Sequence, residues 1–123
     1  MAGATSLPVD AAPLLPQNTP EMTIREAGLI RHIVFFSVRR KEDVEAVRSG
    51  LLELGRIPHS THFEVTLNTK VDLFSNAIDV VVYAEFEDDA ALAAYKAHPL
   101  YAETTSRVKP LRELRYSADV VAA

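Results

Sequence analysis

The sequence predicts an α+β domain with the ferredoxin-like order β-α-β-β-α-β and an antiparallel four-stranded sheet. Three observations carry this prediction. Two segments rich in β-branched and aromatic residues are apolar on both faces, as strands covered on both sides are. Each is followed by a segment with helical periodicity. Two further strand-like segments, one after the first helix and one at the end of the chain, complete the order.

The chain divides into a tail and one domain. Residues 1–27 hold four of the seven prolines, with small residues between them and no sustained period, so they are predicted to form an N-terminal tail. The apolar residues of "APLLP" leave open that this tail docks on the domain or on a partner subunit. Residues 28–123 are predicted to form the folded domain, and a chain of this size supports one core.

The first half of the domain contains a strand, a helix and a second strand. "LIRHIVFFSV" from Leu29 is the two-sided strand. "KEDVEAVRSGLLELGRI" places Val44, Val47, Leu51 and Leu54 three and four residues apart, which predicts an amphipathic helix that stops at Gly55. "THFEVTLNT" alternates Phe63, Val65 and Leu67 with polar residues, which predicts a strand with one apolar face.

The second half repeats the pattern after a loop, "VDLFSN". "AIDVVVYAEFE" is the second two-sided strand, and "DDAALAAYKAH" is a helix opened by two aspartates and interrupted by Pro99. Another short helix is expected from about 100 to 108, closed by Pro110, before the last strand, "LRELRYSADVV". The charged runs "VRRKED" and "RELR" interleave opposite signs, so they are interpreted as solvated surface.

The predicted arrangement leaves one sheet face without helices. That face would carry Ile33, Phe35, Val81 and Tyr83, which is more apolar surface than a monomer leaves in water. We therefore expect the chain to pair with a second copy, sheet against sheet, as a homodimeric α/β barrel.

Composition excludes several classes of function. A net charge of −4, with 13 basic residues scattered among 17 acidic ones, gives no basic stripe for nucleic acid. No apolar run reaches the length of a membrane helix and no signal peptide is evident, so no membrane partner is expected. The absence of cysteine fits a reducing compartment, and we expect a cytoplasmic location.

Three segments carry a resemblance to a known family: "IRHIVFFSV", "VVVYAEFEDDAALAAYKAHP" and "YSADV". Over about residues 29–121 the chain resembles the stress-responsive A/B barrel domain, a branch of the dimeric α/β-barrel superfamily. The strongest parts of the resemblance are His32, the "Y-x-x-H-P" motif of Tyr95, His98 and Pro99, and Asp119.

The resemblance implies a homodimeric barrel with a pocket between each sheet and its helices. Most members have no assigned reaction. In the plant olivetolic acid cyclase, a relative that acts without a cofactor, a tyrosine and a histidine perform the acid-base chemistry. Tyr95 matches that tyrosine, but Tyr101 stands at the position of the histidine. A phenol with a pKa near ~10 is a poor base near neutral pH, so polyketide cyclisation by that mechanism is disfavoured.

Candidate site residues follow from the resemblance and the strand faces. His32 is the candidate base and Tyr95 the candidate hydrogen-bond donor. The other candidate ligand contacts are Val34, Phe36, Leu51, Val80, Val82, His98, Tyr101 and Asp119. Structural roles compete with these. His32 would be a buried histidine bonded to a backbone carbonyl or to Asp119, and His98 would cap the C-terminal end of the interrupted helix.

The sequence offers no cofactor or metal site. His59 and His62 stand near Glu64, but strand alternation sends the two histidines to opposite faces, so no metal is expected. No phosphate-binding glycine loop or axial haem ligand can be identified, so no cofactor is expected. The preferred interpretation is a homodimer that binds a small apolar or phenolic molecule. The alternative is a cofactor-free lyase, isomerase or polyketide-cyclase-like enzyme that uses His32 and Tyr95.

Overall fold

A computed structural model describes residues 28–75 and 77–123. The predicted tail, residues 1–27, lies outside the described residues. The chain forms strands and helices in the predicted order, with a break that splits the second helical segment in two. The elements are β1 (Ile30–Val38), α2 (Val44–Leu52), β2 (His62–Leu67), β3 (Val80–Phe86), α3 (Asp89–Ala97), α4 (Pro99–Val108) and β4 (Arg112–Val121).

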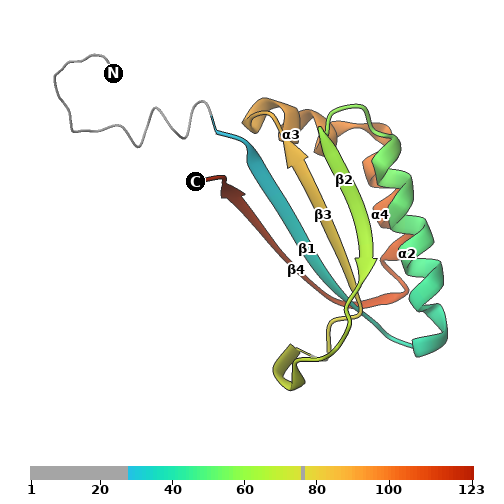
Figure 1. Cartoon of the computed structure of the whole chain (residues 1–123). Helices are drawn as coiled ribbons and strands as arrows, with labels where there is room; N and C mark the ends of the chain where they lie inside the picture. The colour runs from blue at the N-terminus through green and yellow to red at the C-terminus, as the bar shows by residue number, and fades with distance from the viewer. Residues whose placement is uncertain (1–27, 76) are drawn as a thin grey trace, which may run out of the picture.

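The four strands form one antiparallel sheet in the order β2-β3-β1-β4. Helices α2, α3 and α4 all cover the same face, and the opposite face carries no helix (Figure 1). The predicted α+β, ferredoxin-like fold is confirmed. No helix within the described ranges is long and apolar enough to cross a membrane.

Strand alternation sets which side chains reach the core. On β1, His32, Val34 and Phe36 are buried beneath the helices, whereas Arg31 and Phe35 point to the other face. Strand β3 alternates in the same way, with every second residue from Val80 to Phe86 buried. The two central strands therefore supply most of the sheet side of the core.

The helix predicted over residues 41–57 is shorter than its periodicity suggests. Its apolar stripe is buried at Val47, Leu51 and Leu54, but the α-helix ends at Leu52 and a 3₁₀ turn, Glu53–Arg56, continues it. Gly55 lies inside that turn and does not stop the helix. A β-carbon there would lie 2.8 Å from the ring of Phe63 on β2, so glycine is required for close packing against the strand.

The apolar face predicted for β2 is only partly buried. Val65 is buried and Phe63 is half-buried, but Leu67 is 48% exposed. Strand β2 is an edge strand, and Leu67, its last residue, borders a shallow groove beside Lys41 and Val44. The helices cover the strand incompletely at this end.

The break between α3 and α4 is made by His98 and Pro99. Pro99 is the first residue of α4, where its missing N–H is not needed. The Nδ1 atom of His98 accepts a hydrogen bond from the Leu100 N–H at 3.1 Å. His98 therefore caps the N-terminus of α4, and its predicted role at the C-terminus of the preceding helix is wrong. The change of direction brings the ring centroids of Tyr95 and Tyr101 to a distance of 5.3 Å.

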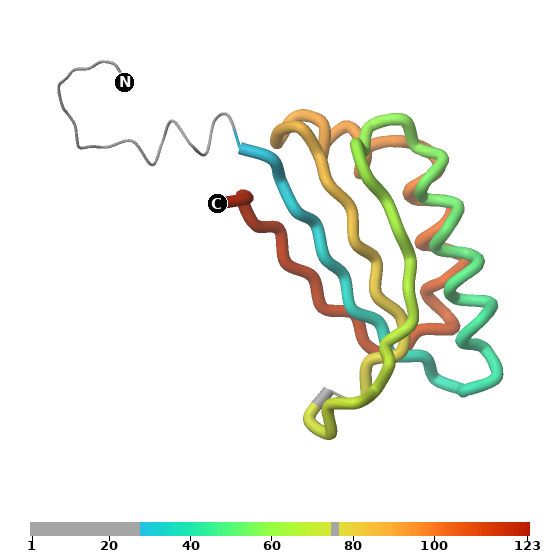
Figure 2. The backbone as a smooth tube through the Cα atoms, in the orientation of Figure 1, coloured from blue at the N-terminus to red at the C-terminus, as the bar shows by residue number. Residues whose placement is uncertain are grey.

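The uncovered sheet face carries the predicted apolar residues. Ile33 pairs with Tyr83, and Phe35 pairs with Val81 on one side and with Tyr116 on the other. Phe35 is 37% exposed and Tyr116 is 65% exposed. Figure 2 shows, in addition, that the loop after β2 projects away from the sheet. Three apolar residues of this loop, Val71, Leu73 and Phe74, are almost fully exposed.

Replacing Thr104 with valine is expected to stabilise the fold. Thr104 on α4 is fully buried, and its hydroxyl has no hydrogen-bond partner among the described residues. A buried hydroxyl without a partner costs about 1–3 kcal/mol, and valine keeps the side-chain shape without that cost. We expect Thr104→Val to raise the free energy of unfolding in urea by about 1 kcal/mol. Thr105→Val is the control, because it breaks hydrogen bonds from the Thr105 hydroxyl to the carbonyl oxygens of Tyr101 and Ala102. A loss of stability in Thr104→Val would contradict the prediction.

Candidate functional site

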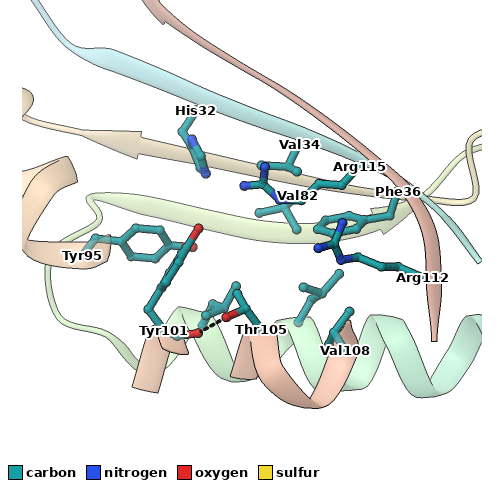
Figure 3. Close-up of a pocket in the computed structure, with 12 residues that line it drawn as sticks. His32, Val34, Phe36, Val82, Tyr95, Tyr101, Thr105, Val108, Arg112 and Arg115 are labelled. Atoms are coloured by element: carbon teal, nitrogen blue, oxygen red, sulfur yellow. Dashed lines mark hydrogen bonds between the residues drawn. The ribbon is translucent and has the colours of Figure 1, made fainter. Parts of the chain in front are cut away.

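A cavity lies between the helix-covered face of the sheet and helices α2, α3 and α4 (Figure 3). The cavity, together with its open mouth, has about 400 Å³ of empty space. The centre of a water molecule can reach about 40 Å³ of that space. Its lining combines an apolar wall with imidazole, phenol and guanidinium groups: His32, Val34, Phe36, Leu51, Leu54, Val82, Tyr95, Tyr101, Thr105, Val108, Arg112 and Arg115.

His32 is buried in the cavity wall, with an exposed fraction of 2%. The strand register places it opposite Asp119 on β4, and its Nδ1 lies 2.5 Å from a carboxylate oxygen of Asp119. A carboxylate only accepts, so Nδ1 carries the proton and donates it. The predicted partnership of His32 with Asp119 is observed. The second ring nitrogen, Nε2, makes no hydrogen bond to any other described residue, so it remains an acceptor on the imidazole.

Burial lowers the pKa of His32 below its ordinary value of 6.5, and the hydrogen bond and negative charge of Asp119 oppose this shift only in part. The positive charges of Lys96 and Arg115 lower the pKa of His32 further. The ring is therefore neutral at pH 7 and gains its charge only below pH 6.5. An Asp-oriented neutral imidazole with an unprotonated Nε2 can accept a proton.

Tyr95 lies on α3 at 1% exposure, packed edge-on against His32 and tilted against Phe86. Burial raises the pKa of Tyr95, the nearby phenol of Tyr101 raises it slightly, and Arg115 opposes the shift. The hydroxyl group therefore stays protonated and can donate a hydrogen bond. It has no hydrogen-bond partner in the described part of the chain.

Tyr101 sits on α4 at the edge of the cavity and is half-buried, and its ring meets that of Tyr95 edge-on (Figure 3). Two phenols from consecutive helices thus lie at one end of the cavity. This end, with His32 on the facing strand, is the polar end nearest to α3.

Seven of the ten predicted site residues line the cavity together: His32, Val34, Phe36, Leu51, Val82, Tyr95 and Tyr101. The other three do not. Val80 is buried in the core, Asp119 lies behind His32 as its hydrogen-bond partner, and His98 caps α4. Asp119 also pairs with Lys96 at 3.9 Å.

Two charged side chains of the cavity wall were missed by the sequence prediction. Arg112 and Arg115 belong to the run "RELR", which was interpreted as solvated surface, and both line the cavity. One signal could have revealed Arg115: it stands four residues before Asp119, so strand alternation puts both on the same face. No sequence signal marks Arg112. Within residues 28–75 and 77–123, no three acidic or histidine side chains gather as a metal site would require.

The family model for the stress responsive A/B barrel domain matches residues 30–122. A search of curated proteins returned no match. Similar solved structures include a ferredoxin-like protein of the same family from Mesorhizobium loti. It is 26% identical with a TM-score of 0.65, and the alignment covers 78% of this chain and 98% of that one.

Two further structures share the fold. A dimeric ferredoxin-like protein of unknown function from Thermobifida fusca is 21% identical, with a TM-score of 0.67 over 79% of this chain and 93% of that one. A hydroxynitrile lyase from Passiflora edulis is 14% identical, with a TM-score of 0.68 over 79% of this chain and 95% of that one. The fold is thus found both in an enzyme and in a protein with no assigned reaction.

Proposed function

Because the chain belongs to the stress responsive A/B barrel domain family, we propose that it is a homodimer in which each cavity binds a small apolar or phenolic molecule. The observation that carries the proposal is the cavity itself, where one apolar wall meets a few polar groups that lack protein partners. Binding sites for small molecules have this composition.

The proposal of a homodimer is based on the apolar residues of the uncovered sheet face. Phe35, Tyr116 and Val120 are each more than a third exposed there, and Ile33, Val81 and Tyr83 lie beside them. Two such faces packed together would remove this apolar surface from water, and about 800 Å² per partner is enough for a stable pair. The relative from Thermobifida fusca is described as dimeric.

The expected ligand would place its ring or chain against Val34, Phe36 and Val82 and its polar group toward His32 and Tyr95. A phenol or carbonyl suits that end. The Tyr95 hydroxyl can donate to a carbonyl oxygen, and Nε2 of His32 can accept from a hydroxyl.

Ring-nitrogen NMR of the histidines tests this proposal. The full chain would be titrated from pH 5 to 9, alone and with 4-methylphenol and small β-keto compounds. We expect His32 to hold the Nδ1–H tautomer at pH 7, to take up its second proton only below pH 6.5, and to shift when a compound binds. His62 is the internal control, since it lies on the opposite sheet face with Glu64 2.8 Å away. If no compound shifts His32 selectively, the binding proposal fails.

A second candidate function is a cofactor-free lyase or isomerase. It is favoured by one observation: the neutral imidazole and a protonated phenol lie on facing walls of one cavity, with ring centroids 5.9 Å apart. Nε2 of His32 would take a proton from a carbon or hydroxyl of the substrate, while Tyr95 would donate a hydrogen bond to the developing oxyanion. Asp119 would stabilise the imidazolium that forms.

The enzyme and binding functions differ in one measurable property. If His32 acts as a base, the protein would catalyse the exchange of the α-protons of a bound β-keto compound for deuterium from D₂O. His32→Gln would abolish this catalysed exchange while binding remained. A pure binding protein would show the NMR shifts without catalysing exchange.

A further inference from the structure

The cavity has a second polar end, formed by Arg112 and Arg115 on β4. Arg115 pairs with Phe36 across the sheet, so it lies on the helix-covered face. Figure 3 shows both arginine side chains reaching from β4 into the space beside Phe36 and Val34. His32 and Tyr95 lie farther along the cavity, toward the other end of β4.

A β-bulge places Arg112 on this face. Leu114 pairs with Ser37, but Val38 pairs with Arg112, so Glu113 is the extra residue of β4. Without the bulge Glu113 would oppose Val38 and occupy the inward position. Instead Glu113 is exposed and Arg112 is half-buried in the cavity wall. The Ser37 hydroxyl accepts a hydrogen bond from the Leu114 N–H at 3.1 Å, so this backbone donor beside the bulge has a partner. A bulge that redirects a side chain in this way is common beside functional sites.

The cavity contains positive charge without a matching carboxylate. None of its twelve lining residues is an aspartate or glutamate, and neither guanidinium makes an ion pair or hydrogen bond to another described residue. Asp119, which lies behind His32, is already bonded to His32 and paired with Lys96. The positive charge of Arg115 also reaches the far end of the cavity, since it opposes protonation of His32. Half-buried guanidinium groups in such a wall are available to bind an anion, and their planar fork matches a carboxylate.

We propose that the cavity selects small carboxylic acids, with the carboxylate held by Arg112 and Arg115 and the apolar or aromatic body against Val34, Phe36 and Val82. This inference rests on the proposed function and names its ligand class. A planar carboxylate can accept paired hydrogen bonds from a guanidinium, which gives orientation as well as affinity. The acid group would then fix one end of the ligand and direct its other polar group toward Tyr95 and His32.

Matched pairs of ligands test the proposal without any variant. Calorimetric titration of the full chain would compare 4-hydroxybenzoate with 4-hydroxybenzamide, and benzoate with benzamide. Hydrogen bonds to charged groups are worth about 1.5–3 kcal/mol, so each acid is expected to bind at least ~10-fold more tightly than its amide. Amides that bind as tightly as the acids would overturn the carboxylate inference and leave the binding proposal intact.

Three variants locate the effect. Arg115→Gln and Arg112→Gln are each expected to weaken binding of the acid more than binding of the amide, and so to remove most of the acid's advantage. The matched control is Arg107→Gln, because Arg107 is exposed on α4, pairs with Glu103 at 3.6 Å and does not line the cavity. An unchanged acid preference in both cavity variants would overturn the inference. If neither acids, amides nor 4-methylphenol bind the unmodified protein, the proposed function itself fails.

Discussion

Phe35→Glu is expected to convert the proposed dimer into a monomer. Phe35 lies at the middle of the uncovered face, between Val81 and Tyr116, and is 37% exposed in the single chain. Burying a phenylalanine side chain is worth about 1.5–3 kcal/mol, and a two-fold interface loses it twice. The substitution also places two carboxylates in an apolar contact. We expect the dissociation constant to rise by at least ~100-fold, as measured by sedimentation or light scattering over a dilution series.

Leu52→Glu is the matched control for this experiment. Leu52 is 41% exposed, close to the value for Phe35, but it lies on α2 and so on the opposite side of the sheet. The control should remain dimeric, and circular dichroism should show that both variants stay folded. If Leu52→Glu dissociates the protein and Phe35→Glu does not, then the interface lies on the helices and the proposed sheet-to-sheet barrel is wrong.

The open face illustrates what the sequence determines well. Alternation along β1 and β3 assigned each side chain to a face, because the strand period of two leaves no freedom once one residue is placed. Alternation puts His32, Val34 and Phe36 on one face and Phe35 on the other, the family resemblance directs the first face toward a pocket, and in the structure these three side chains are buried on the helix-covered side. The same argument applied to β4 would have placed Arg115 beside them.

Local exceptions to periodicity could not be predicted in this way. The bulge after Ser37 changes the face of Arg112, and it depends on a pairing between two strands that are far apart in the sequence. Likewise, Gly55 is a helix terminator by propensity, but its role is set by the ring of Phe63. Long-range contacts decide such positions, and a single sequence does not contain them.

The break at His98 and Pro99 was predicted, but its consequence was not. A histidine followed by proline is extended, so a helix boundary was expected there. Whether the imidazole would serve the helix before it or after it depends on which backbone groups it can reach. In the structure Nδ1 accepts the Leu100 N–H, which lies in the first turn of α4.

Phe86→Ala is expected to cause the largest loss of stability. Phe86 is fully buried at the end of β3 and contacts the rings of both His32 and Tyr95, with centroid distances of 6.0 Å and 4.9 Å. Truncating a core phenylalanine to alanine costs about 3–5 kcal/mol of stability, because the burial of the removed ring is lost and a cavity remains in its place. Urea unfolding at one fixed protein concentration should show a decrease of this size, whereas Phe86→Leu should lose roughly 1 kcal/mol.

The same variant separates packing from site chemistry, because Phe86 helps to bury His32. Removing its ring would let water approach the imidazole, so the pKa of His32 should move back up toward 6.5 in Phe86→Ala and stay lowered in Phe86→Leu. Ring-nitrogen NMR reads this directly. If Phe86→Ala is as stable as Phe86→Leu and leaves the titration of His32 unchanged, then the aromatic cluster does not set the state of the candidate base, and burial by other residues together with the charges of Lys96 and Arg115 would have to account for the lowered pKa.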